Sequence, residues 1–246
     1  MSKWLLACAL LLAGCSAPKD NTIKLAYVQW SSAVAATEQV QKRLEAAGFT
    51  VKLVPVTTGA MWAGVASGSV DATVSAWLPQ TQAQYAKLYL AKVEDVGPNL
   101  EGVKLGLAVP QDSPLQSITD LKDFSGPILG IDPGAGLMTL TKRAMGAYGL
   151  GNKLLPGSGP AMGYLLKRAV KEGRPVVVTA WWPHLIVEEL HLRFLDDPKG
   201  IYPQGESVHT LVSRSLKEQH PKAYAILKGF HWTPRQVLDA MRAARQ

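Results

Sequence analysis

Cysteine is almost absent from this chain of 246 residues, which contains only Cys8 and Cys15. Cys8 falls in an N-terminal segment that we expect to be removed, so a mature chain with one cysteine has no internal disulfide and its fold rests on a hydrophobic core. His and Cys do not cluster at metal-ligand spacing, and the sequence lacks a GxxxxGK[ST] phosphate loop and a G-x-S-x-G nucleophile turn. We therefore expect no metal, no cofactor and no enzymatic activity.

Long apolar runs are also missing, because a membrane-crossing helix needs about 20 apolar residues. The run from Trp4 to Ala13 is shorter, follows one lysine and ends in small residues, which is the pattern of a signal peptide. Residues 12–15, Leu-Ala-Gly-Cys, resemble a bacterial lipobox, which implies cleavage before Cys15 and lipid on that cysteine. We predict a lipoprotein signal peptide over 1–14, a polar tether over 15–22 and an extracytoplasmic, membrane-anchored protein. The alternatives are an ordinary signal peptide or a buried N-terminal helix.

The chain carries a formal net charge of +7, but its basic residues show no concentrated patch. They occur singly or in pairs such as Lys42-Arg43 and Lys167-Arg168, mostly on polar faces of expected helices. A charge distributed in this way is typical of a solvated surface. We therefore expect no nucleic-acid partner.

Hydrophobic periodicity predicts alternating strands and helices in two series. The first series has strands over 23–29, 49–57 and 70–77 and helices over 35–47, 59–68 and 79–90. A strand over 103–110 breaks the alternation, and the second series has strands over 128–132 and 175–180 with helices over 137–148 and 161–172. A strand over 208–212 and helices over 216–229 and 234–244 end the chain. This pattern is typical of parallel sheets covered by helices.

Two arrangements fit these elements. One is a single doubly wound domain. The other has two lobes, with residues 23–104 and 207–246 in lobe I and residues 105–206 in lobe II. Ligands of open α/β sheets bind outside the carboxyl ends of the strands. Trp30, Trp77 and Trp181 lie at or near such ends, which favours one common cleft.

The tryptophans are the residues that indicate the chemical class of the ligand most directly. Trp77 and Trp181 each end an expected strand, and Trp232 lies in a loop between two helices, whereas Trp62 lies in mid-helix and is most simply core. An indole face attracts a quaternary ammonium by about 0.5–2 kcal/mol per ring, and such a cation has no N–H to donate. These rings therefore indicate a quaternary ammonium ligand.

Six segments in this order resemble the glycine betaine-binding proteins of bacterial ABC importers. They are YVQWS (27–31), AWLP (76–79), GIDPGAG (130–136), TAWWPH (179–184), DPKG (197–200) and FHWT (230–233). The resemblance implies an α/β, two-lobed periplasmic-binding-protein fold of the type II kind, with the ligand in the cleft between the lobes. It also implies an importer permease and its ATPase as partners of a monomeric binding protein.

The resemblance further implies that Trp77, Trp181 and Trp232 form an aromatic cage around the trimethylammonium group. The ligand carboxylate would be met at the first strand–helix turn by Ser31, Ser32, Ala33 and Val34, with His231 assisting. Further candidates are Trp30, Trp182 and His184, although strand alternation points Trp182 away from the cleft, toward packing. Family members often carry Asp and His where this chain has Ser75 and Gln82, so the choice among betaines, choline and carnitine stays open.

The resulting hypothesis is a lipid-anchored binding protein that captures glycine betaine, or a related quaternary ammonium compound, for osmoprotection or nutrient uptake. One rival is a periplasmic enzyme acting on an amine or amino acid. Another is a binding module for amino acids or another anion. Within the binding-protein hypothesis, the alternative ligand is choline, carnitine or another amino-acid-like zwitterion. The DPGAG turn at 132–136 is compatible with either a tight turn or an anion-holding, ligand-facing role.

Overall fold

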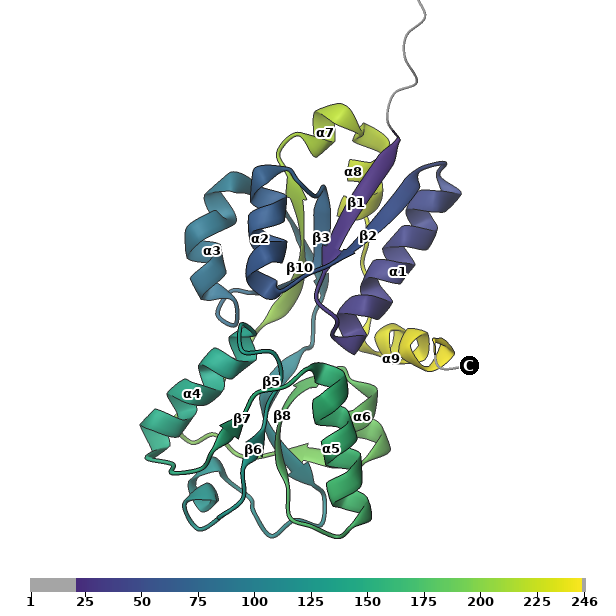
Figure 1. Ribbon diagram of the computed structural model, residues 1–246. Helices are drawn as coiled ribbons and strands as arrows, with labels where there is room; N and C mark the ends of the chain where they lie inside the picture. The colour runs from purple at the N-terminus through teal and green to yellow at the C-terminus, as the bar shows by residue number, and fades with distance from the viewer. Residues whose placement is uncertain (1–20, 245–246) are drawn as a thin grey trace, which may run out of the picture.

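The computed structural model describes residues 21–244, which form two lobes stacked end to end (Figure 1). The predicted signal peptide, Cys15 and the tether up to residue 20 lie outside the described residues. Each lobe contains one five-stranded sheet flanked by helices. The predicted two-lobed α/β fold is therefore confirmed, and the single doubly wound domain is excluded.

Lobe I contains a mixed sheet of strand order β2-β1-β3-β10-β4. Strands β1 to β3 are parallel, and β10 runs antiparallel to both of its neighbours. Its elements are β1 (Thr22–Tyr27), α1 (Ser31–Ala46), β2 (Thr50–Pro55), α2 (Thr58–Ser67), β3 (Ala72–Leu78), α3 (Ala83–Tyr89), the 3₁₀ turn η1 (Leu90–Lys92), β4 (Val93–Leu100), β10 (Ser207–Ser213), α7 (Leu216–Gln219), α8 (Pro221–Lys228) and α9 (Pro234–Ala243).

Lobe II contains the second sheet, of strand order β7-β6-β8-β5-β9. Strand β6 is parallel to β7 and β8, whereas β5 is antiparallel to β8. Its elements are β5 (Lys104–Pro110), the 3₁₀ turn η2 (Ile118–Lys122), β6 (Ile128–Leu129), α4 (Gly136–Tyr148), β7 (Leu154–Leu155), α5 (Gly159–Lys171), β8 (Val177–Trp182), α6 (Leu185–Glu189) and β9 (Leu192–Phe194).

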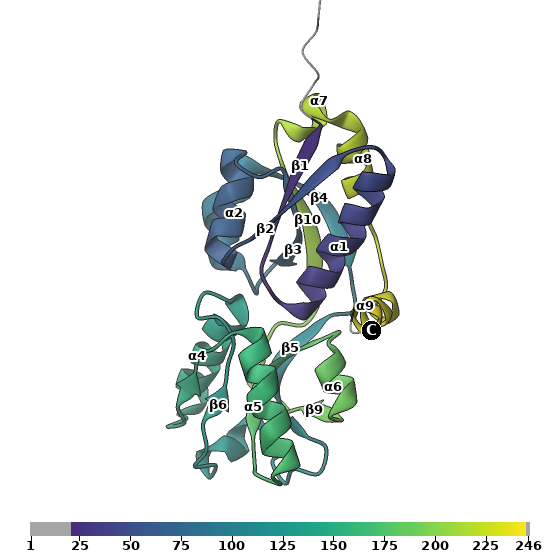
Figure 2. The same cartoon turned by 45° about the vertical axis from the view of Figure 1, so that its right-hand side comes forward.

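The chain passes between the lobes twice, over residues 101–103 and 195–206. Its last three helices belong to lobe I, and α9 lies at the level of the junction in both views (Figures 1 and 2). Helix α9 packs against α1 and also contacts α6 of lobe II. The C-terminal helix therefore bridges the two lobes.

Several predicted boundaries are wrong, each for a local reason. The expected helix over 79–90 begins only at Ala83, because the backbone N–H groups of Gln80 and Thr81 bond the Glu206 side chain instead of starting a helix. Helix α1 begins at Ser31, four residues before its expected start. Strand β4 was not predicted because it contains Gly97 and Pro98, which an edge strand tolerates.

Proline also divides the expected helix over 216–229. Helix α7 ends at Gln219 and α8 begins with Pro221 in its first turn, where a proline needs no N–H partner. At the centre of lobe I every residue of β3 is buried, and Trp62 is fully buried beneath it, which confirms Trp62 as core. Because the whole of β3 is buried, packing fixes the position of its last residues, Trp77 and Leu78.

Candidate functional site

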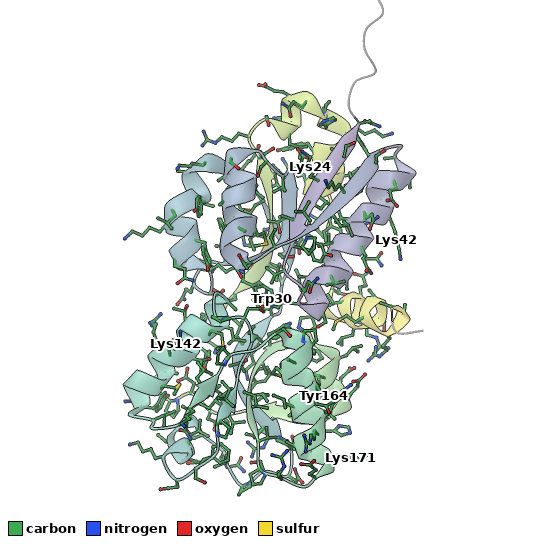
Figure 3. All side chains as sticks on the ribbon, in the orientation of Figure 1. Lys24, Trp30, Lys42, Lys142, Tyr164 and Lys171 are labelled. Carbon is green, nitrogen blue, oxygen red and sulfur yellow. The ribbon has the colours of Figure 1, made fainter. Side chains whose placement is uncertain are left out.

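Two tryptophan side chains connect the lobes through hydrogen bonds at the edges of their rings. Trp30 Nε1 of lobe I donates to Asp132 Oδ2 of lobe II over 2.8 Å. Trp181 Nε1 of lobe II donates to Ser32 Oγ of lobe I over 3.1 Å. Figure 3 shows Trp30 at the junction of the lobes. Because both bonds use the ring edge, the indole faces are left for other contacts.

Two further contacts close the junction on either side of these tryptophans. The Tyr85 hydroxyl of α3 donates to the Gly134 carbonyl over 2.8 Å. On another side, Arg242 of α9 forms an ion pair with Glu188 of α6. The structure is therefore a closed arrangement. The two lobes touch through pairs of residues that lie far apart in the sequence.

A small cavity, here called the tryptophan cavity, lies between the lobes and has about 20 Å³ of water-accessible space. Its lining residues come from both lobes and are Trp30, Trp77, Thr81, Gln82, Leu105, Ile131, Ala135, Gly136, Leu137 and Trp181. None of these side chains is ionisable. The cavity is thus aromatic and apolar, and an organic cation would be held there by indole faces and not by a carboxylate.

A second small cavity, here called the adjoining cavity, shares Trp77 with the first and has about 10 Å³ of water-accessible space. It is lined by Ser32, Ala33, Ala36, Val74, Ser75, Trp77, Asn99, Leu100, Val208 and Trp232. It is more polar, because Ser32, Ser75 and Asn99 line it. Among residues 21–244, Ser75 Oγ, Asn99 Oδ1 and Trp232 Nε1 are buried and have no hydrogen-bond partner. Trp77 therefore borders both cavities, the first lined mainly by aromatic and apolar residues and the second by more polar ones.

The N-terminus of α1 lies beside the adjoining cavity. Trp30 occupies the N-cap position with an extended backbone and makes no side-chain cap, and the first intrahelical bond is Val34 N to Trp30 O, at 2.8 Å. The N–H groups of Ser31, Ser32 and Ala33 precede that bond, and such groups with the helix dipole favour an anion. Ser32 and Ala33 line the adjoining cavity, whereas Ser31 and Val34 line a wider groove on the surface.

The end of β8 places the adjacent tryptophans in different environments. Trp181 is buried and lines the tryptophan cavity, and its ring meets the His184 ring edge-on, with centroids 4.5 Å apart. Trp182 is half-buried, packs against the core and lines neither cavity. His184 Nδ1 accepts the Ile186 N–H and caps α6, so it supports the Trp181 ring from behind.

His231 is the predicted site residue that the structure separates most clearly from the others. Its side chain is exposed, and it lines neither cavity. Its neighbour Trp232 lines the adjoining cavity and packs against Phe230, with ring centroids 5.4 Å apart. The loop before α9 thus brings the tryptophan, not the histidine, to the adjoining cavity.

The turn that carries Trp77 is held by a carboxylate from the return connection. Glu206 is buried, and its two oxygens accept the Gln80 and Thr81 N–H groups over 2.7 and 3.0 Å. The Gln82 N–H then bonds the Trp77 carbonyl over 3.1 Å. Trp77 and Gln82 are consequently fixed relative to one another, and sequence reasoning missed Glu206 because it lies more than 120 residues away.

The DPGAG segment is both a tight turn and part of the junction. The Ala135 N–H bonds the Asp132 carbonyl over 2.9 Å, which makes the turn, and the Asp132 carboxylate is engaged by Trp30. Gly136, the first residue of α4, lies so close to lobe I that a Cβ there would stand 1.9 Å from the Thr81 carbonyl oxygen. A glycine is required at 136 for the lobes to approach this closely.

Two tyrosines of lobe II have raised pKa values, and neither lines one of the two cavities. Burial raises the pKa of Tyr202, and burial with a hydrogen bond to Asp197 raises the pKa of Tyr148, in the body of lobe II. Among residues 21–244, no group of three or more His, Cys, Asp or Glu side chains is placed to hold a metal ion. Within the same range, no helix is both long and apolar enough to cross a membrane.

The structure therefore brings together Trp30, Trp77 and Trp181 in one cavity, and Ser32, Ala33, Trp77 and Trp232 in the next. It leaves the predicted residues Ser31, Val34, Trp182, His184 and His231 outside both. Sequence reasoning missed Thr81, Asn99 and the apolar wall from Leu105 and Ile131. Of the missed lining residues, only Gln82 was noticeable in the sequence. It stands where members of the family that the chain resembles often have a histidine.

Comparisons with known proteins point to one family. The family described as the substrate binding domain of ABC-type glycine betaine transport systems matches residues 21–246. The glycine betaine/carnitine transport binding protein GbuC of Listeria monocytogenes serotype 1/2a (strain 10403S) is 43% identical over 117 residues. That match covers 46% of this chain and 39% of GbuC, so the chain spans well under half of this curated relative.

Two solved structures resemble the whole fold. Lactococcal OpuAC, closed and complexed with glycine betaine, has a TM-score of 0.88 and 35% identity, covering 92% of this chain and 90% of its own. The glycine betaine, L-proline transporter binding protein ProX from Borrelia burgdorferi has a TM-score of 0.86 and 34% identity, covering 91% and 87%. The first of these shares the closed arrangement seen here.

Proposed function

The chain belongs to this family of substrate-binding domains of ABC-type glycine betaine transport systems, and from that premise we propose that it captures glycine betaine or a related quaternary ammonium compound outside the cytoplasm. It then delivers the ligand to an importer permease driven by an ATPase. One observation carries the proposal. The cavity between the lobes presents three indole rings and contains no ionisable side chain among its lining residues.

The trimethylammonium group lies against Trp77 in this proposal, enclosed by Trp181 and Trp30 on one side and by Trp232 on the other. Each indole face contributes about 0.5–2 kcal/mol, and more where water is excluded. The positive charge needs no carboxylate partner. A ligand of zero net charge therefore leaves no charged side chain of the cavity unpaired.

In this proposal the ligand carboxylate extends toward the N-terminus of α1, where Ser32 and Ala33 line the adjoining cavity. The helix dipole and the free first-turn N–H groups together stabilise an anion there. Because Ser32 Oγ also accepts the Trp181 indole N–H, the same short segment contacts the cage and the anion site. His231, which the structure leaves exposed, has no part in this placement.

The protein performs no chemistry in this proposal and releases its ligand unchanged. It acts as a monomer, tethered through lipid on Cys15, for osmoprotection or nutrient uptake. A periplasmic enzyme would instead convert the ligand. Mass spectrometry of the ligand recovered after prolonged incubation distinguishes the two, because any product would contradict the transport proposal.

The proposal is tested by isothermal titration calorimetry of residues 16–246 with glycine betaine, and with Trp77→Ala, Trp181→Ala and Trp232→Ala variants. Loss of ring area and cation attraction is expected to weaken binding by about 1–3 kcal/mol in each. Trp182→Ala is the matched control, because it removes the neighbouring ring outside both cavities and should leave affinity unchanged. Wild-type affinity in two of the three cage variants would contradict the cage.

A further inference from the structure

Glu206 is a buried carboxylate that no basic side chain of residues 21–244 neutralises. It ends the connection that returns from lobe II to lobe I, and it is 4% exposed. It takes part in none of the ion pairs of those residues, and its two hydrogen bonds come from the backbone N–H groups of Gln80 and Thr81. A buried charge without an opposite charge is costly, so a role beyond packing is expected for it.

The carboxylate lies one residue away from the tryptophan cavity. Thr81 donates its backbone N–H to Glu206 Oε2 over 3.0 Å and also lines that cavity. Strand β10 begins directly after Glu206 and pairs Val208 with Trp77, so the carboxylate stands beside the end of β3 that carries this ring. A hydrogen bond plus the width of one residue puts the carboxylate roughly 8–10 Å from a cation in the cavity.

A negative charge at this separation attracts a cation through the protein interior. The residues that line the tryptophan cavity carry no charge that would oppose the attraction. The two backbone N–H groups hold the carboxylate in place, but they have no net charge and therefore do not cancel its own. With an effective dielectric constant of about 20–40, the attraction corresponds to about 5- to 20-fold in affinity.

We propose that Glu206 is the counter-charge of the quaternary ammonium group, and that it makes the cavity select a cation over an uncharged group of the same shape. The inference rests on the proposed function, because it needs an ammonium group against Trp77. The indole faces make the contact, so the carboxylate does not have to touch the ligand. Glu206 also holds the turn at Gln80 and Thr81, and the test must therefore separate its charge from its shape.

The experiment compares glycine betaine with tert-butylacetate, in which a carbon atom replaces the nitrogen. The two ligands have the same shape and the same carboxylate, and they differ in the positive charge. Affinities are measured by isothermal titration calorimetry of residues 16–246. The ratio of the two affinities, here called the charge preference, reports the response to the cation, because a displaced turn weakens both ligands alike.

Three variants of Glu206 separate its charge from its shape. Glu206→Gln and Glu206→Met remove the charge and are expected to lower the charge preference by about 5- to 20-fold. Glu206→Asp keeps the charge on a shorter side chain, so the charge preference should stay within about twofold of wild type even where both ligands bind more weakly. Glu206→Met places no NH₂ against a backbone N–H, which keeps the test available if Glu206→Gln fails to fold.

Asp197→Asn is the matched control. Asp197 lies in the same connection and also accepts a backbone N–H, from Tyr202 over 2.7 Å. Its other partner is the hydroxyl of Tyr148, the last residue of α4, whereas the cavity is lined by Gly136 at the start of that helix. The rise of the helix separates these two ends by roughly 18 Å. A charge removed there should leave the charge preference within about twofold of wild type.

The outcomes separate this inference from the proposed function. If the wild-type protein does not bind glycine betaine, the proposed function fails. If it binds glycine betaine but the charge preference is unchanged in the neutral variants that fold, only the inference is overturned, because Glu206 then does no more than hold the turn. An equal drop in Glu206→Asp also overturns it, since shape and not charge would then set the preference. An equal drop in Asp197→Asn overturns it as well, because the effect would not be specific to Glu206.

Discussion

Replacement of Gly136 by alanine should disable closure of the lobes without destabilising either of them. In the closed structure the added Cβ would lie 1.9 Å from the Thr81 carbonyl oxygen and 2.6 Å from its carbonyl carbon. Those are backbone atoms and cannot rotate away, so the lobes must separate by more than about 1 Å to reach an ordinary contact near 3.4 Å. The open form does not meet this obstacle.

The magnitude follows from the contacts that such a separation breaks. Trp30 to Asp132, Trp181 to Ser32 and Tyr85 to Gly134 are hydrogen bonds across the junction. At about 0.5–1.5 kcal/mol each, losing two of them weakens binding by about 1–3 kcal/mol, or roughly 5- to 150-fold. Ligand contacts that need both lobes add to this loss.

The assay pairs calorimetric titration of glycine betaine with thermal unfolding of Gly136→Ala. Affinity should fall while the unfolding temperature changes little, because the obstacle to the added Cβ comes from the other lobe and Gly136 is only the first residue of α4. Gly146→Ala is the control, because it makes the same change in α4 at a position where a Cβ meets nothing. Wild-type affinity in Gly136→Ala would refute the reasoning that this glycine permits closure.

Four further outcomes follow from the same contacts. Trp30→Phe removes the N–H donated to Asp132 but keeps an aromatic wall, so ligand affinity measured by titration should fall only about three- to tenfold. Glu206→Gln places an NH₂ against a backbone N–H of Gln80 or Thr81, and chemical denaturation should show a loss of about 1–3 kcal/mol. Because the residues lining both cavities do not titrate, affinity for glycine betaine should vary less than about twofold between pH 5 and 9. Burial raises the pKa of Asp95, but hydrogen bonds from the His209 side chain and the Gly97 N–H outweigh it, so the net pKa is lowered. The resulting stability is present above about pH 4 and is lost as the pH falls through the folded pKa, so the gap in unfolding free energy between wild type and Asp95→Asn should close in acid.

Features that depend on a short stretch of sequence, such as the central strands and the positions of their last residues, were predicted from the sequence. Valine-rich and alternating segments located the central strands, and a strand that ends in tryptophan predicted where Trp77 and Trp181 would lie. Both line the cavity between the lobes. Strand alternation also separated Trp181 from Trp182, which the structure leaves half-buried and outside both cavities. In each case one residue's direction followed from the element that contains it.

Contacts across the junction were not predictable in this way. Glu206 holds a turn more than 120 residues earlier, and Asp132 meets Trp30 across 102 positions. His231 was predicted to contact the ligand, but it lies in a loop, where a side chain can point in several directions. In the structure His231 is exposed and Trp232 lines the adjoining cavity instead. Pairings of this kind depend on how two lobes meet, and no spacing within one segment encodes them.

Closure and ligand capture are coupled because the same tryptophans serve both. Trp30 and Trp181 use their ring edges to bond the opposite lobe, and both residues also line the cavity. A cation against those faces favours the closed form in proportion to its differential affinity for the two forms, and it needs no other trigger. Variants that remove an indole N–H but keep a ring, such as Trp30→Phe, should therefore weaken closure more than ring contact. Variants that remove the whole ring, such as Trp181→Ala, must weaken both, so the difference between the two kinds of variant measures how much of the affinity comes from closure.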